Sequence, residues 1–284
     1  MSQRQCPAEF PCVGVDCSGL WVSNTDVEIR EDRGACQGDV AFPEALRDAV
    51  FCFDGKGGVS ADLSRLSSNE ASAAKGCMSF GTLPCPFKKV ALAAVQFTAA
   101  ASGCFTLDAP VWVAPLWMTP SVWRPPQEKS GEVDFMERCG TELGAGFAAN
   151  FGGGMSIPLT GGVEVRHDYF FTFDRVQDVV SAYRCAEKSN PSGSRDLPQS
   201  CVLLGSNAGY FARTEQRGVE RNTFHFVSDI WNTLRAGAGA CTPSARSLLN
   251  RACRYEVVDL KVRLNDEATK EAWLRDPVCR LLLP

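Results

Sequence analysis

From residue 88 onward, the chain alternates short apolar runs with turns that contain Gly, Pro or Asp. The runs are rich in β-branched and aromatic residues, which fit the pleated, half-buried surface of a sheet. The pattern predicts strands at residues 90–98, 111–118, 131–137, 169–173, 223–231 and 255–264. Many short strands separated by Gly/Pro turns indicate an all-β sandwich.

The first part of the chain has a different pattern. Residues 1–55 combine many cysteines with prolines between short apolar patches, which favours an irregular region stapled by disulfides. Residues 54–76 carry turn signals and weak periodicity, so we expect a connector there rather than core. The uncharged stretch at 90–107 has the length of a membrane span, but its polar residues favour buried strands and no span.

A short helix is predicted near the C-terminus. Asn265 and Asp266 can cap a helix at 267–274, and Pro277 ends it. Cys279 is then placed to staple this tail to the rest of the chain.

Composition indicates an ordinary folded chain. It has 284 residues, of which 45% are hydrophobic, so we expect a single domain over 1–284 that includes the helical tail at 265–284. The net charge is -4 and no block of Lys and Arg occurs, which argues against nucleic acid as a partner. The Gly-rich pieces at 152–154 and 161–162 lack the context of a phosphate loop, so no cofactor is expected. We expect a monomer.

Cysteine is the outlier in this composition. The chain has 14 cysteines and only two histidines, without a Cys-x-x-Cys pair, so disulfides are favoured over metal sites. Several disulfides imply an oxidising compartment, and we expect a secreted or cell-wall protein. The alternative is a cytosolic protein with buried thiols. No signal peptide is visible in the first residues, so a secretory signal was removed or the sequence is truncated.

Three acids are concentrated in one predicted strand, at Glu132, Asp134 and Glu137. Alternation places Glu132 and Asp134 on one face of the sheet and Glu137 on the other. A β-bulge that adds one residue at Phe135 or Met136 would bring all three acids to the same face. Two carboxyl groups about 5 Å apart are what a retaining glycosidase requires.

This geometry gives each acid an expected role. Glu132 would attack the anomeric carbon, and Glu137 would protonate the leaving oxygen and later deprotonate water or a sugar hydroxyl. Asp134 would be hydrogen-bonded to Glu132. Repulsion between the three carboxylates should raise one pKa, and we assign the retained proton to Glu137. The alternative is an ordinary solvated polar face of a strand.

The segment around these acids resembles glycoside hydrolase family 16, which includes laminarinases, agarases and xyloglucan transglycosylases. The matching segments are Trp112-Val-Ala-Pro-Leu-Trp117-Met-Thr-Pro120 with Trp123, Gly131-Glu-Val-Asp-Phe-Met-Glu137, Phe147-Ala-Ala-Asn-Phe-Gly-Gly153, Phe224-His-Phe-Val-Ser-Asp-Ile-Trp231 and Tyr255-Glu-Val-Val-Asp259. The resemblance covers residues 90–264. It implies a concanavalin-A-like jelly roll, with the acid strand on the floor of a concave substrate cleft.

The resemblance also implies an activity and its substrate contacts. It suggests an endo-acting hydrolase or transglycosylase on a β-glucan, most readily β-1,3-glucan. Trp117 and Trp123 are candidates for sugar stacking, with core packing as the alternative. Asn150 is a candidate substrate-binding residue at a position where many laminarinase-type members have His. The chain also departs from the family in a shifted Trp/Pro spacing before Trp117 and a shortened stretch between Trp231 and Tyr255.

Other interpretations remain open. A catalytically silent polysaccharide-binding module of the same fold, or a structural disulfide-rich coat protein, would share these features. His225 is expected to be a structural strand residue, and His167 a surface loop residue. Two unplaced histidines give no support for a serine-type hydrolase.

Overall fold

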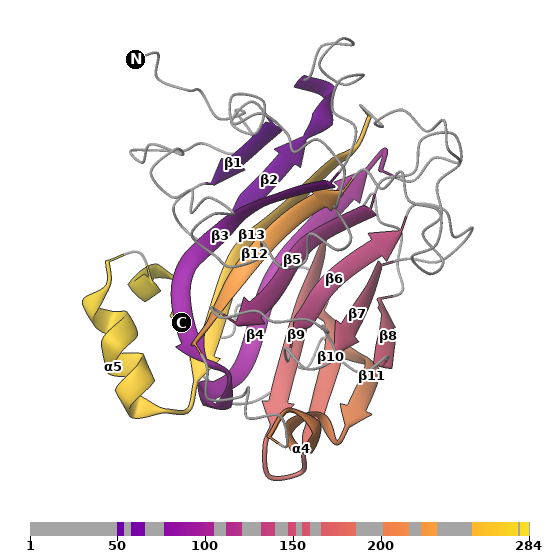
Figure 1. Cartoon of the computed structure of the whole chain (residues 1–284). Helices are drawn as coiled ribbons and strands as arrows, with labels where there is room; N and C mark the ends of the chain where they lie inside the picture. The colour runs from indigo at the N-terminus through magenta and orange to yellow at the C-terminus, as the bar shows by residue number, and fades with distance from the viewer. Residues whose placement is uncertain are drawn as a thin grey trace.

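The computed structural model describes residues 50–53, 58–65, 77–104, 112–120, 132–139, 147–151, 155–159, 166–185, 201–215, 223–231, 252–277 and 279–283. These residues form two antiparallel sheets that pack face to face (Figure 1). The predicted all-β jelly-roll sandwich is therefore confirmed. The predicted cysteine-rich region lies outside the described residues as far as residue 49.

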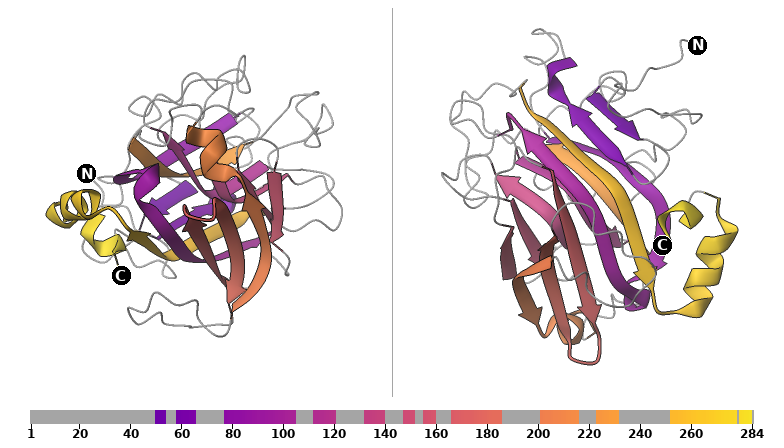
Figure 2. Two further views of the ribbon diagram at one scale, coloured as in Figure 1. Left: turned by 90° about the horizontal axis from the view of Figure 1, so that it is seen from below. Right: turned by 180° about the vertical axis from the view of Figure 1, so that it is seen from behind.

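One sheet has seven strands and contains both the first and the last strand of the described chain (Figure 2). In spatial order it consists of β1 (Phe51–Phe53), β2 (Val59–Asp62), β13 (Arg254–Leu264), β4 (Leu92–Ser102), β9 (His167–Asp174), β10 (Val179–Cys185) and β11 (Cys201–Ala208). The expectation of a connector at 54–76 is wrong for its middle part, because Val59 and Ala61 are buried in the core. Strand β2 is only four residues long, too short to show a clear period in the sequence.

The other sheet has six strands and carries the predicted acids. In spatial order it consists of β3 (Cys77–Lys88), β12 (Thr223–Trp231), β5 (Trp112–Pro120), β6 (Val133–Cys139), β7 (Phe147–Phe151) and β8 (Met155–Leu159). All six strands predicted from the sequence are present across the two sheets, with boundaries within a few residues.

Helices are few among the described residues. They are α4 (Tyr210–Glu215), α5 (Glu267–Arg275) and the 3-10 segments η3 (Leu63–Arg65), η4 (Lys89–Ala91) and η6 (Cys279–Leu282). The predicted C-terminal helix is confirmed as α5. As expected, Asp266 caps it by accepting a hydrogen bond from the Thr269 backbone N–H at 3.2 Å. None of the helices in the described part of the chain is long and apolar enough to cross a membrane.

Aromatic rings fill the space between the sheets. Phe135 of β6 lies at the centre of this cluster, with its ring 5.3 Å from that of Phe171 and 6.0 Å from that of Phe226. Phe97 of β4 meets Phe135 edge-on at 6.4 Å. All four rings are fully buried, and burial of one such side chain stabilises the fold by about 1.5–3 kcal/mol. The two sheets are therefore joined through Phe135.

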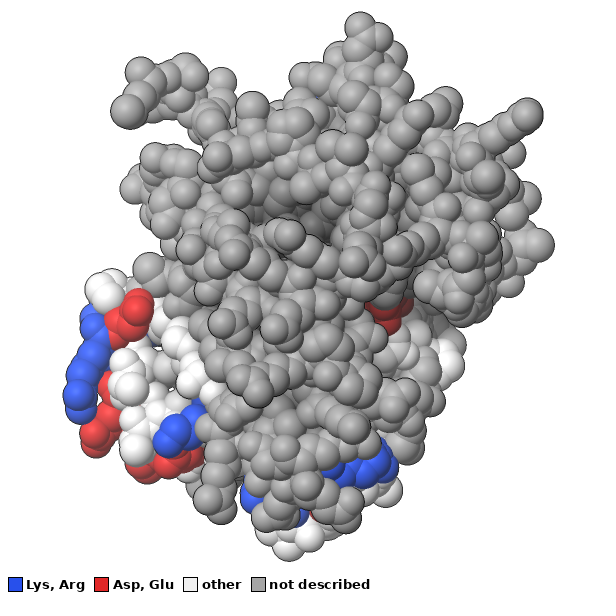
Figure 3. All heavy atoms as spheres, viewed as in Figure 1, with Lys and Arg blue, Asp and Glu red and all other residues white. Residues whose placement is uncertain are grey.

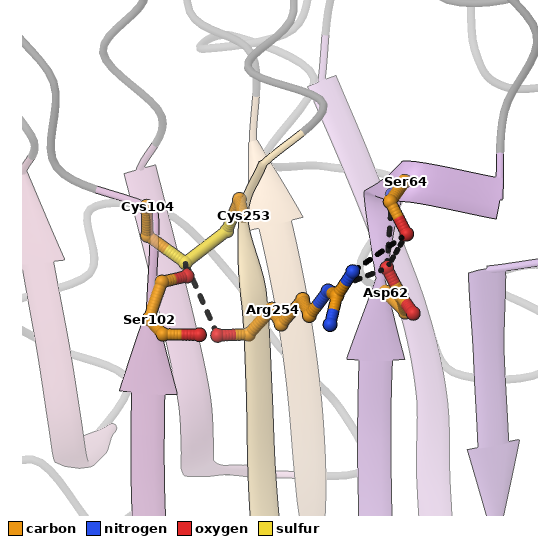
Figure 4. Close-up of a disulfide and its surroundings, with 6 residues drawn as sticks. All are labelled: Asp62, Ser64, Ser102, Cys104, Cys253 and Arg254. Carbon is orange, nitrogen blue, oxygen red and sulfur yellow. Dashed lines mark hydrogen bonds and ion pairs between the residues drawn. A yellow bond between two sulfur atoms is a disulfide. The ribbon is translucent and has the colours of Figure 1, made fainter. Parts of the chain in front are cut away.

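Disulfides add covalent links, as the cysteine content predicts. Cys104 and Cys253 join the adjacent ends of β4 and β13 (Figure 4), across a sequence separation of 149. Cys185 and Cys201 join β10 to β11 across a separation of 16.

We expect the two bridges to differ in their contribution to stability, because a cross-link that closes a longer loop removes more entropy from the unfolded chain. Replacing Cys104 and Cys253 by Ser should lower the free energy of unfolding by about 4–5 kcal/mol, and replacing Cys185 and Cys201 by about 3 kcal/mol. Urea unfolding of the two double variants against wild type measures both values. Equal losses would contradict this ranking.

Candidate active site

A β-bulge interrupts β6 between Asp134 and Glu137. On the β5 side, Leu116 pairs with Met136 and the next residue, Trp117, pairs with Asp134, so Phe135 is an extra residue. On the β7 side, Asn150 pairs with Asp134 and Ala148 pairs with Glu137. The chain thus advances by three residues in β6 where β7 advances by two. The bulge predicted at Phe135 or Met136 is thus confirmed.

The bulge places Asp134 and Glu137 on the same face of the sheet. Directly paired residues share a face, and their partners Asn150 and Ala148 are two residues apart on β7. Val133, Phe135 and Met136 belong to the buried core, whereas Asp134 and Glu137 are partly exposed. The two acids therefore lie on the face of the six-stranded sheet that points away from the core.

Glu132 lies immediately before β6 and is also partly exposed. It is two residues from Asp134, so continued alternation would put it on the same outer face. That all three acids act together remains a prediction.

A row of residues crosses the outer face through Asp134. Val227 of β12 pairs with Trp117 of β5, Trp117 pairs with Asp134 of β6, and Asp134 pairs with Asn150 of β7. Asn150 in turn pairs with Ser156 of β8. Five strands thus contribute one residue each to a continuous row beside the acids.

Asn150 reaches Glu137 directly. Its side-chain amide nitrogen donates a hydrogen bond to the Oε2 atom of Glu137. This contact runs diagonally across the β6–β7 pair, between residues that the bulge brings to one face. Asn150 is predicted above to bind substrate, and its amide is in contact with an acid in the structure. The sequence contains no local signal for this contact, since it depends on the register of β6 and β7.

Trp117 packs in a small apolar cluster with Ala114 and Val227, separate from the main core. Only 5% of Trp117 is exposed, so its ring face is not open for stacking in this conformation. Its indole N–H is buried without a hydrogen-bond partner in the described structure. A buried donor without a partner costs folding free energy. Trp123 lies outside the described residues.

The two histidines lie in different sheets. His225 belongs to β12, where it pairs with Thr119, as expected for a strand residue. The expectation of a loop position for His167 is wrong, because it begins β9 and pairs with Ala99. It is half-buried, with its ring 6.3 Å from that of Tyr169. The approach of β9 to β4 places it in the sheet, and no local signal in the sequence indicates this pairing.

A polar group that sequence reasoning missed lies in the core beside the acid strand. Tyr210 is fully buried against Phe151 of β7, and the Nζ atom of Lys89 lies 4.1 Å from its ring centroid. Burial raises the pKa of Tyr210 well above its ordinary value; nearby Arg213 opposes this shift, and the negative charge of Asp134 adds to it. Tyr210 therefore stays protonated in the core.

The fold and this group of residues define an all-β sandwich with acids and a neutral amide donor on the outer face of one sheet. Within the ranges that the structure describes, no three His, Cys, Asp or Glu side chains form a group that could hold a metal ion.

Comparison with protein families and with curated proteins gave no match. Solved structures with a similar arrangement include SCLam, a non-specific endo-β-1,3(4)-glucanase from family GH16, at 14% identity and a TM-score of 0.49, over 86% of this chain and 83% of that one. The laminarinase catalytic domain from Thermotoga maritima MSB8 has 16% identity and a TM-score of 0.46, over 88% and 93%. The winged bean acidic lectin has 10% identity and a TM-score of 0.38, over 72% and 77%. At these values the likeness carries no argument about activity.

Proposed function

We propose that this protein is a retaining, endo-acting glycosidase or transglycosylase of β-glucans, with β-1,3-glucan as its preferred substrate. The observation that carries the proposal is the β-bulge, which brings Glu137 to the same face as Asp134. The bulge turns both acids toward the same side of the sheet, and a two-carboxylate mechanism needs both acids to face one cleft, where they flank the glycosidic bond.

In the first step, the Glu132 carboxylate attacks the anomeric carbon and the glycosidic bond breaks. Glu137 donates its proton to the leaving oxygen, so the released chain carries a hydroxyl and the sugar is bound to Glu132 as an ester. In the second step, Glu137 takes a proton from water or from an acceptor hydroxyl, which attacks the same carbon and frees Glu132. Water gives hydrolysis, and an acceptor sugar gives transfer.

Asp134 lies between the two glutamates in sequence and on the same face as Glu137. A carboxylate there disfavours a second negative charge nearby, which helps one acid to keep its proton at neutral pH. The hydrogen bond from Asn150 favours the ionised form of Glu137 and acts in the opposite direction. The working protonation state is thus a balance between Asp134 and Asn150.

The roles of the two glutamates can be separated by substrate choice. Wild type should release reducing sugar or exchange chains on laminarin, with mixed-linkage glucan, xyloglucan and agarose tested alongside. Glu132→Gln should lower kcat at least a thousandfold on every substrate, because no nucleophile remains. Glu137→Gln should lower kcat by about 10²–10⁴-fold on laminarin. The loss should be smaller on an aryl glycoside, because its leaving group needs no proton.

Glu256→Gln is the matched control for these variants. Glu256 is a half-buried strand residue of β13 in the other sheet, where it forms an ion pair with Arg166, and its replacement should leave kcat unchanged. Binding of wild type to laminarin without turnover would favour the silent binding module. Absence of both binding and turnover would favour the structural coat protein.

The contact between Asn150 and Glu137 gives a prediction about pH. The alkaline limb of kcat/KM reports loss of the proton from the acid catalyst. Asn150→Ala removes a donor that stabilises the Glu137 carboxylate, so this limb should move to higher pH, and Asn150→Asp should move it further by adding a like charge.

Profiles of kcat/KM from pH 4 to 10 measure this shift, with Ser156→Ala as the control because Ser156 pairs with Asn150 on the side away from Glu137. A raised KM with an unchanged alkaline limb would instead assign Asn150 to substrate binding.

A further inference from the structure

The C-terminal helix α5 is attached to the edge of the six-stranded sheet. Trp273 of α5 is 3% exposed, and its ring meets Phe87 of β3 edge-on at 5.9 Å. Its indole N–H donates to the backbone oxygen of Pro86. The opposite side of the helix carries acidic and basic residues in alternation (Figure 3), including the pair Arg275–Glu271 at 3.6 Å. The buried side of α5 therefore lies on β3.

Two buried thiols meet at this junction. Cys85 of β3 is fully buried and Cys279 of η6 is 1% exposed. Both belong to the main buried core, and Cys85 directly precedes Pro86, whose backbone oxygen accepts from Trp273. Asp276 fixes the position of Cys279 through two hydrogen bonds. Its carboxylate accepts from the Cys279 backbone N–H at 3.2 Å, and its backbone oxygen accepts from the Arg280 backbone N–H at 3.0 Å. The pair is thus held in contact from both sides, by the Trp273–Pro86 bond and by the turn at Asp276.

We propose that Cys85 and Cys279 are the site of a further disulfide, which locks the C-terminal helix onto the edge strand β3. The oxidant would be the disulfide of a small thiol such as oxidised glutathione. One cysteine, as its thiolate, attacks that disulfide and releases one small thiol. The other cysteine then attacks the mixed disulfide and releases the second. The two cysteines lose two protons and two electrons, and the small-molecule disulfide is reduced to two thiols.

The surroundings of the pair determine when this reaction occurs. The hydrogen bond with Cys279 and burial raise the pKa of Cys85 far above its ordinary value, so the thiol stays protonated in the folded protein. Only the thiolate attacks a disulfide, and a fully buried sulfur is also inaccessible to an oxidant. The bond therefore forms while the chain folds, and reduced folded protein acquires it slowly.

The lock would join distant parts of the molecule. Positions 85 and 279 are about 190 residues apart, so the loop that the bond closes is longer than that of Cys104–Cys253. The helix α5 follows β13 of the seven-stranded sheet, whereas β3 is the edge strand of the other sheet. The bond would link the two sheets at their rim, where Figure 2 shows α5 beside them.

Refolding of the full chain with a mixture of reduced and oxidised glutathione, followed by alkylation and trypsin without reduction, tests the proposal. We expect a cross-linked pair of peptides 76–88 and 276–280, with fragmentation that assigns the bond to Cys85 rather than Cys77. The sample used is one in which Cys104–Cys253 and Cys185–Cys201 are found joined. Alkylated Cys85 and Cys279 in that sample would overturn the proposal.

The matched control is the double variant Cys85→Ser/Cys279→Ser, whose hydroxyls can keep the hydrogen bond but cannot cross-link. The oxidised wild type should melt about 5–10 °C above this variant, and the difference should vanish when both are reduced. Each single Ser variant should lose the cross-linked peptide and show the lower melting temperature. A difference in melting temperature that persists in reduced protein would assign the effect to packing and overturn the proposed disulfide.

Discussion

The burial of Phe135 and Met136 side by side is the constraint on which the candidate site depends. A regular strand points adjacent side chains to opposite faces, so it cannot bury both residues in one core. Strand β6 solves this with a bulge, and Phe135 then packs between the two sheets while Met136 lies beside it. The bulge also turns Glu137 to the face of Asp134. The repulsion between these acids is thus opposed by the packing of the core.

Much of the fold could be predicted because its central strands carry strong local signals. The predicted range for β12 matches the observed strand, and β4, β5, β6, β9 and β13 differ from their predictions by a few residues. The sequence does not predict the interior strands β2, β7 and β10 or the four edge strands, and for two edges the physical reason is clear. Strand β3 contains Pro84 and Pro86, which a central strand rarely tolerates but an edge strand accepts, because not every N–H needs a partner. At the opposite edge, β11 exposes Val202 and Leu203 and so lacks a clear alternation.

The candidate site also has a part that the sequence predicts and a part that it does not. The acids and the bulge lie within the six consecutive positions 132–137, so local spacing is enough to predict them. The partnership of Asn150 with Glu137 depends on the pairing of β6 with β7 across residues 140–146, and no local rule sets that register. The burial of Trp117 likewise results from its neighbours on β5 and β12. Sequence therefore indicates which residues carry the chemistry, whereas their relations depend on tertiary structure.

A neutral amide at position 150 has a consequence for the acids beside it. Asparagine donates a hydrogen bond at every pH, whereas an imidazole, present in many proteins of the family that this sequence resembles, changes charge between pH 5 and 8. Among the residues of β5, β6 and β7 whose side chains the structure describes, the outer face then carries the carboxylates Asp134 and Glu137. Their neighbours Asn150, Ala148 and Trp117 are neutral. On β12, His225 and Asp229 pair with Thr119 and Ala114 of β5. Because Asn150 does not titrate, its hydrogen bond to Glu137 adds no titrating group of its own beside the acids.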